Sequence, residues 1–178
     1  MSHISQIDYA TAPAENRAAF DEEVRLRGRT TAMKRTLMHS VPAYRSYMEW
    51  YTLRDELLGV LDDRAIWVFS HAISAANDCL ICVTYFRKAL IEAGFQPGEF
   101  QTTEEEDLLV EFGVAIAKNS NAVSDAIWQN LKVRYDEKAL VDLVAFAGIM
   151  IATNIFNNVV GVELDADIEP FRKPEAAE

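Results

Sequence analysis

The sequence is poor in the residues that interrupt helices. Of its 178 residues, 7 are glycine and 5 are proline. No segment alternates apolar and polar residues over five or more positions, which is the pattern of a half-buried strand. Helical spacing of apolar residues recurs along nearly the whole chain instead. These features predict an all-α protein, a single-domain helical bundle of about 6–8 helices.

Basic residues are scarce as well. There are 17 lysines and arginines against 28 acidic residues, a net charge of −11. An acidic surface repels phosphate groups, so we expect neither nucleic acid nor a membrane surface as a partner. Residues 1–20 have no basic stretch followed by an apolar one, as a secretory signal would. The most apolar run, Leu143 to Thr153, is shorter than the about 20 residues of a membrane span. By elimination we expect a cytoplasmic protein.

The length fits one domain with a substantial core, since half of the residues are hydrophobic and a quarter are charged. We expect residues 1–13 to form a loose N-terminal lead. Residues 14–165 form the single all-α domain, and residues 166–178 form a charged, proline-punctuated C-terminal tail.

Capping residues and glycine or proline stops divide the chain into expected helices. Asp62 and Asp136 are typical helix caps, and Thr103 with Glu106 has the spacing of a capping box. The segment 95–101, FQPGEFQ, is expected to be a loop. The expected helices cover residues 14–27, 31–39, 42–61, 63–76, 79–93, 107–118, 121–133 and 136–159.

The last expected helix is apolar on nearly all sides, so it should be central in the bundle. Asn154, Asn157 and Asn158 lie near its end, and buried amides need partners. We expect them to cap the helix end or to pair across a subunit interface.

Both cysteines of the chain lie in one C-x-x-C motif, Cys79 and Cys82. Positions i and i+3 share a helix face, with Cβ atoms about 5–6 Å apart, close to disulfide geometry. If Asn77 caps the helix, Cys79 lies in its first turn, where free N–H groups favour a thiolate, although Asp78 opposes it. Cys82, one turn deeper, then has the place of a resolving partner. The alternative is two small buried core residues.

A metal site is not expected at this motif. Zinc requires four ligands, and the chain offers Cys79, Cys82 and at most His71. A thioredoxin-like assignment fails too, because that fold needs strands around the motif. We therefore expect no metal and no cofactor, and in a cytoplasmic compartment the pair is not expected to be a structural disulfide.

His71 is the one histidine near the motif. On an unbroken helix it would lie about 12 Å along the axis from Cys79, so the two meet only if the chain bends near residues 74–78. The alternative is a hydrogen-bonded core histidine. Trp67, Tyr85 and Phe86 are candidates for the wall of an apolar pocket beside the thiols, or else ordinary core aromatics.

Two segments together resemble a known superfamily. AISAANDCLICVTYFRKALIEAGF, residues 72–95, is similar to the core segment of alkylhydroperoxidase-D-like and carboxymuconolactone-decarboxylase-like proteins. Residues 123–165, which end in FNNVVGVELD, are similar to the longer members. The resemblance implies an all-α fold that assembles as trimers or hexamers. We accordingly expect a homo-oligomer, either a dimer, a trimer or a hexamer.

The peroxidase branch of that superfamily implies roles for the two cysteines. Cys82 would attack the peroxide, Cys79 would resolve the sulfenic acid to a disulfide, and an external dithiol would restore the pair. The branch also uses a glutamate and a histidine as a proton relay, but Trp67 and Phe86 occupy those positions here. His71, one turn from the lost glutamate, is our candidate for the missing base.

The sequence thus favours a thiol-dependent peroxidase or disulfide oxidoreductase that reduces a small organic hydroperoxide, with Cys79, Cys82 and His71 catalytic. Two alternatives stay open. One is a lyase acting on a small carboxylated lactone, as in the other branch. The other is a non-catalytic oligomeric redox-sensing protein of the same fold.

Overall fold

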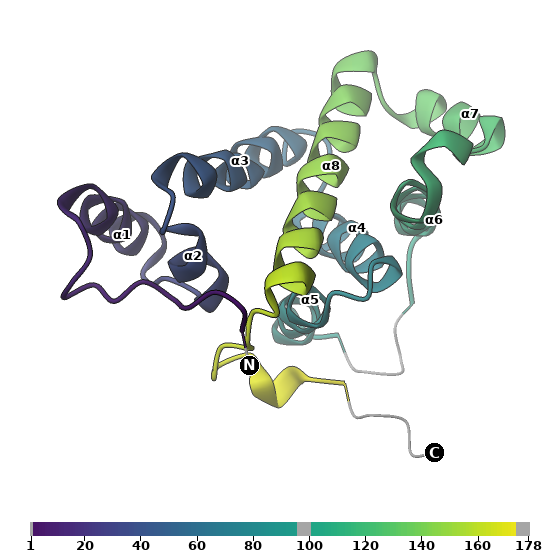
Figure 1. The fold of residues 1–178 in the computed structure, drawn as a ribbon. Coiled ribbons are helices and arrows are strands. Elements are labelled where there is room, and N and C mark those ends of the chain that lie inside the picture. The colour runs from purple at the N-terminus through teal and green to yellow at the C-terminus, as the bar shows by residue number, and fades with distance from the viewer. Residues whose placement is uncertain (1, 96–100, 174–178) are drawn as a thin grey trace.

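The computed structural model describes residues 2–95 and 101–173. Within these residues the chain forms eight α-helices and two short 3₁₀ turns and has no strand, which confirms the all-α prediction. Figure 1 shows α8 running through the molecule, with α1 to α3 on one side of it and α4 to α7 on the other. The helices are α1 (Ala14–Arg27), α2 (Ala32–Leu37), α3 (Val41–Leu57), α4 (Asp63–Ala76), α5 (Leu80–Glu92), α6 (Glu104–Asn119), α7 (Asp125–Arg134) and α8 (Glu137–Val160), and the turns are η1 (Ser120–Ala122) and η2 (Glu169–Phe171).

The expected helix caps are present. The side chain of Asp62 accepts the backbone N–H of Ala65 and starts α4. Thr103 and Glu106 form a reciprocal capping box at the start of α6. Gly28 ends α1 with a φ of 77°, a left-handed conformation that glycine adopts without steric cost. Local signals therefore set most of the helix boundaries.

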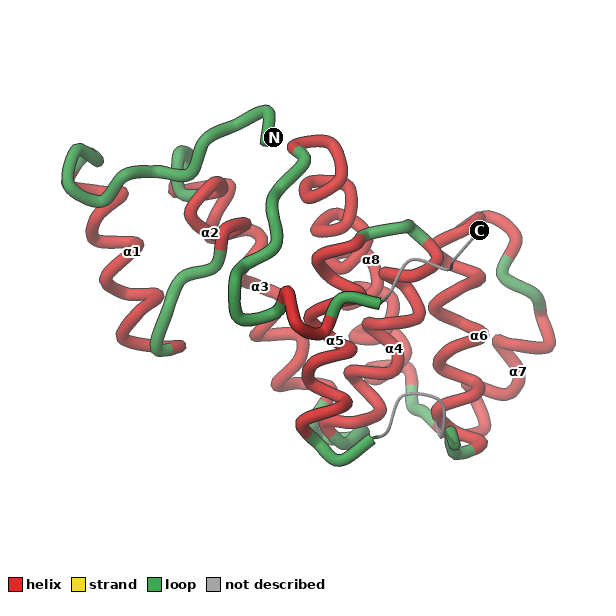
Figure 2. Tube along the Cα trace, turned by 90° about the horizontal axis from the view of Figure 1, so that it is seen from below, coloured by secondary structure: helices red, strands yellow, loops and turns green. Residues whose placement is uncertain are grey.

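The main core lies between α4, α5, α6 and α8. Phe69 on α4 stacks on Phe112 of α6 and on Phe146 of α8, with ring centroids 6.1 and 6.0 Å apart, and all three rings are fully buried. Gly113 brings α6 close to α4, because a Cβ there would lie 3.1 Å from the Phe69 ring. Figure 2 shows the same helices packed side by side from below.

Helix α8 is only half enclosed, unlike the expected central helix. Its buried face carries Phe146, Met150 and Asn154, and its opposite face leaves valines and an isoleucine exposed. By length and composition α8 is the one helix in the described part of the chain that could cross a membrane, a test that core helices of soluble proteins also pass. The exposed apolar residues are Val141, Val144, Ile155 and Val159.

A second cluster joins the N-terminal segment to α2 and α3. Ile7 and Ala12 are buried there against Leu37 and Tyr44. The backbone N–H of Ile7 donates to the Arg35 carbonyl at 3.1 Å. These contacts hold Ile7 and Ala12 of the expected lead against the domain, and most of its other described residues are exposed.

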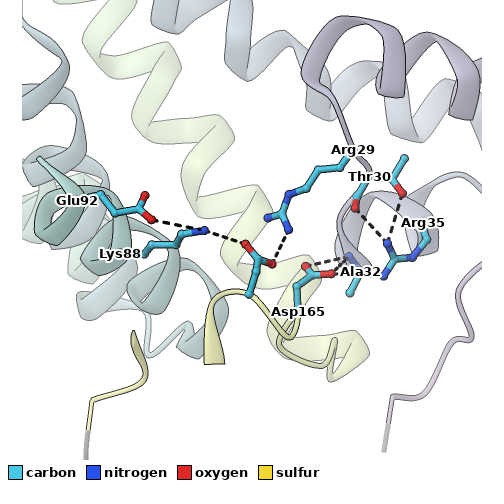
Figure 3. Close-up of polar contacts among 8 residues, drawn as sticks. Arg29, Thr30, Ala32, Arg35, Lys88, Glu92 and Asp165 are labelled. Atoms are coloured by element: carbon cyan, nitrogen blue, oxygen red, sulfur yellow. Dashed lines mark hydrogen bonds and ion pairs between the residues drawn. The ribbon is translucent and has the colours of Figure 1, made fainter. Parts of the chain in front are cut away.

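The C-terminal segment is tied across two distant parts of the chain (Figure 3). Asp165 accepts the backbone N–H of Ala32 at 2.9 Å. Asp167 forms ion pairs with Arg29 and, at 2.8 Å, with Lys88 of α5. These two cations hold the pKa of the Asp167 carboxyl at about 2, below its ordinary range.

The expected tail therefore begins with packed residues. Ile168 is 2% exposed and Asp167 pairs with Arg29 and Lys88, so these two residues of the expected tail contact the domain. Residues 174–178 of that tail, and residues 96–100 of the expected loop over 95–101, lie outside the described residues.

Candidate dithiol site

The chain bends between α4 and α5, in the region where the sequence analysis looked for a bend. Asn77 ends α4, and Asp78 has a φ of 51°, an uncommon left-handed conformation for a residue with a side chain. The backbone N–H of Cys79 then donates to the Ser74 carbonyl at 3.0 Å. Cys79 becomes the N-cap residue of α5, and Cys82 lies in the first turn.

One amide from α8 serves both sulfurs. Asn157 Nδ2 donates to Cys82 Sγ at 3.3 Å and lies 3.8 Å from Cys79 Sγ. Cys79 is fully buried, Cys82 is 6% exposed, and both are free thiols. Within the described ranges no three His, Cys, Asp or Glu side chains gather as a metal-ligand set. The site is therefore a buried dithiol with an amide donor.

The neighbouring amides of α8 hold the α4–α5 junction. Asn154 Nδ2 donates to Ser74 Oγ at 3.3 Å, and Asn154 Oδ1 accepts from Asn77 Nδ2 at 3.2 Å. Asn158 Nδ2 donates to the Asn77 carbonyl at 2.9 Å. The three asparagines thus bind other segments of the same chain, where the sequence analysis expected them to cap α8 or to pair across a subunit interface. Buried amides in an apolar helix were the signal that pointed to them.

The two thiols differ in acidity. The pKa of Cys79 is lowered to about 7, chiefly because its thiolate accepts the S–H of Cys82, and further by the Cys82 backbone N–H and the Asn157 amide. The pKa of Cys82 is raised, because its proton is held in that hydrogen bond and because the thiol is buried. Near pH 7 the pair is therefore about half ionised, and the negative charge lies mainly on Cys79.

Cys82 opens on a pocket of about 330 Å³, which we call the dithiol pocket. Tyr85 and Phe86, two of the three expected wall residues, line it together with Cys82. Trp67, the third, is partly buried against the main core and does not line it. The rest of the wall comes mainly from α2, α3, α8 and the C-terminal segment, and includes Lys34, Tyr47, Met48, Trp50, Tyr51, Met150, Asn157, Asp165 and Ile168.

A buried charged network forms one end of the dithiol pocket. Glu23 of α1 is fully buried and accepts hydrogen bonds from Lys34 and Tyr44, and from Arg27 at 2.8 Å. Lys34 Nζ also donates to Tyr51 Oη at 2.8 Å. Burial lowers the pKa of Lys34. Sequence reasoning missed this network, because α1 and α2 come together only through tertiary packing.

His71 is not brought to the dithiol pocket. It lines a second pocket of about 880 Å³ between α4, α5 and α6, which we call the histidine pocket, and neither cysteine is among the residues described as lining it. The bend is present, but Ser74 and Asn77 occupy the face of α4 that meets α8. His71 lies on another face, beside Val68 and Ala72.

Comparison with solved structures identifies the fold of this chain. An uncharacterized peroxidase-related protein from Silicibacter sp. TM1040 superposes with a TM-score of 0.75 at 16% identity, over 94% of this chain and 96% of that one. An alkylhydroperoxidase AhpD core protein from Ralstonia eutropha JMP134 gives 0.72 at 20% identity, over 98% of both chains. The chain therefore has the alkylhydroperoxidase-D-like fold.

The debrominase Bmp8 has this architecture too. Its structure in complex with 2,3,4-tribromopyrrole, solved for a cysteine-to-alanine variant, superposes with a TM-score of 0.73 at 15% identity over 96% of each chain. No family model matches the sequence, and no curated protein sequence matches it. Structural similarity at these identities is evidence of fold, and the chemistry has to be argued from the dithiol and its pocket.

Proposed function

We propose that this chain, built on the alkylhydroperoxidase-D-like fold, is a dithiol reductase of small organic hydroperoxides. The observation that carries the proposal is the pairing of an acidic thiol with a second thiol that faces a pocket. Cys79 has a pKa of about 7, and Cys82 lines the dithiol pocket. A thiolate is the nucleophile in such chemistry, and two neighbouring thiols supply two electrons.

The two sulfurs have different roles in the proposed reaction because only Cys82 faces the pocket. Cys79 is fully buried, so its charge is not in contact with the pocket. Transfer of the Cys82 proton to Cys79 along their hydrogen bond leaves a Cys82 thiolate at the pocket wall. Cys79 thus acts as the base, and the mechanism needs neither the missing glutamate and histidine nor His71.

The reaction then balances without a cofactor. The Cys82 thiolate attacks the outer oxygen of the hydroperoxide, the O–O bond breaks, and the alkoxide takes the proton from Cys79. The Cys79 thiolate attacks the resulting Cys82 sulfenic acid and expels hydroxide, which takes a proton from solvent. The sum is two thiols and one hydroperoxide giving a disulfide, an alcohol and water. An external dithiol reduces the disulfide again.

The dithiol pocket supports an organic substrate. Trp50 and Phe86 supply aromatic wall, and the volume of about 330 Å³ matches a molecule of roughly one ring. Lys34 and Tyr51 supply donors at its polar end. A hydroperoxide with an apolar body and a further polar group fits these walls better than hydrogen peroxide does.

The test is the consumption of cumene hydroperoxide by the reduced chain. We expect loss of two free thiols per molecule of hydroperoxide, recovery with dithiothreitol, and slower reaction with hydrogen peroxide. Cys82→Ser should abolish the reaction, and Cys79→Ser should allow sulfenic acid to accumulate without a disulfide. Consumption by Cys82→Ser at the parent rate would refute the proposal.

Reductive debromination is a second candidate, favoured by the similarity to Bmp8 together with the aromatic wall around Cys82. There a bromoarene and two thiols give the arene, a disulfide and hydrogen bromide. Incubation of the reduced chain with 2,3,4-tribromopyrrole distinguishes the two. Bromide release with loss of two thiols, and no reaction with cumene hydroperoxide, would favour debromination.

A further inference from the structure

The histidine pocket is separate from the chemistry proposed above. It lies between α4, α5 and α6, and its volume of about 880 Å³ is within the range of pockets that hold small molecules. Most of its wall is apolar and includes Val68, Ile91, Val110 and Val114. A few polar side chains join this wall, which is the usual composition of a ligand site.

Arg87 lines the pocket. Its Nε is buried and has no hydrogen-bond partner among the residues that the structure describes. Asp78 and Asp107 also line the pocket, but the structure places neither in an ion pair with Arg87. Asp107 instead accepts from Thr102, and Asp78 is exposed. A guanidinium N–H that is buried away from water and has no acceptor raises the free energy of the folded chain. Binding of an anion beside Arg87 would supply that acceptor and is therefore favoured.

Charged groups of both signs lie near His71. Burial lowers the pKa of His71, and Arg87 and Lys173 lower it further. Lys118 of α6 adds another cation to the wall, and Asp78 and Asp107 are the acidic groups there. His71 is therefore a neutral hydrogen-bond donor near neutral pH, and Arg87 and Lys118 are the cations on the same wall.

We propose that the histidine pocket is a binding site for a small organic carboxylate. Its carboxylate group binds Arg87 and His71, and its hydrocarbon body packs against Val68, Val110 and Val114. The planar guanidinium suits a carboxylate, with which it forms paired hydrogen bonds. The histidine pocket shares no lining residue with the dithiol pocket. The carboxylate proposal can therefore be tested independently of the peroxidase proposal.

The experiment measures binding of sodium octanoate to the full-length reduced chain by isothermal titration calorimetry. Octanamide, which keeps the chain length and lacks the charge, is the ligand control. We expect Arg87→Gln to weaken octanoate binding about tenfold or more. Lys132→Gln, which removes one exposed cation on α7 outside the pocket, should change it less than twofold.

A second measurement locates the ligand without relying on a variant. The chain has three histidines, His3, His39 and His71. A bound carboxylate beside the ring stabilises the imidazolium, so octanoate should raise the pKa of His71 in an NMR titration and leave the other two unchanged. Binding should also persist in a Cys79→Ser, Cys82→Ser double variant.

Four results would overturn the proposal. The first is no saturable binding of octanoate to the parent chain. The second is equal binding of octanoate and octanamide, and the third is parent-like binding by folded Arg87→Gln. Loss of binding in the double cysteine variant would likewise place the ligand elsewhere. None of these results bears on thiol loss with cumene hydroperoxide, so the two proposals fail separately.

Discussion

Replacing Asn157 by alanine tests whether the α8 amide sets the acidity of the dithiol. In the structure Asn157 Nδ2 lies 3.3 Å from Cys82 Sγ and 3.8 Å from Cys79 Sγ. The Oδ1 atom of Asn157 is buried and has no hydrogen-bond partner within the described part of the chain. Burying an unpaired amide oxygen costs free energy, and the hydrogen bonds from Nδ2 to the sulfurs offset that cost. Asn157→Ala therefore removes a hydrogen-bond donor from the thiolate.

The expected shift follows from the geometry. A hydrogen bond to a charged group contributes about 1.5–3 kcal/mol, and 1.36 kcal/mol corresponds to about one pKa unit. The contact to Cys79 is long, and the Cys82 S–H is the larger cause of the low pKa. We therefore expect a rise of about one unit, from about 7 to roughly 8.

The assay is the absorbance of the thiolate near 240 nm as a function of pH, with the rate of iodoacetamide alkylation beside it. At pH 7 the ionised fraction should fall from about one half to about one tenth, so alkylation slows about fivefold. At pH 9 the alkylation rates of the parent and Asn157→Ala should differ less than twofold. Asn158→Ala, which removes the bond to the Asn77 carbonyl, is the matched control. An unchanged first ionisation in a folded Asn157→Ala chain would show that the amide does not stabilise the thiolate.

Further outcomes follow from other parts of the molecule. Because the pKa of His71 lies below its ordinary value of 6.5, the unfolded chain takes up that proton first as the pH falls. Stability should decrease below about pH 6.5, and urea titrations of His71→Gln should show a shallower decrease. Gly113→Ala places a methyl group 3.0 Å from Ile73 and 3.1 Å from Phe69, and should cost about 1–3 kcal/mol in thermal unfolding. If the exposed apolar face of α8 is covered by a second copy of the chain, Val144→Glu should shift the sedimentation coefficient toward the monomer, and an unchanged coefficient would exclude that face.

Much of the fold could be predicted because helix boundaries are encoded locally. Asp62 and the Thr103–Glu106 box act over three or four residues, and both are where the sequence analysis placed them. The exposed face of α8 was not predicted, since valine and leucine spacing does not say which neighbour, if any, covers a face.

The site was predictable in part for the same reason. Cys79 and Cys82 are close in sequence, and so are Tyr85 and Phe86, which share their helix. The direction of His71 depends on how α4 is rotated against α5 and α8, which no local signal fixes. Lys34 is more than forty residues from the motif, and its place beside the dithiol pocket depends on how α2 packs against α3.

The dithiol pocket takes wall residues from segments far apart in the sequence. Lys34 lies on α2, and Asp165 and Ile168 lie in the segment that follows α8. A chain cut by a protease just after α8 would keep both sulfurs and the amide of Asn157 but would lose part of the pocket wall. The enclosure of Cys82 thus depends on the segment after α8, and chains cut there should react with thiol reagents faster than the uncut protein.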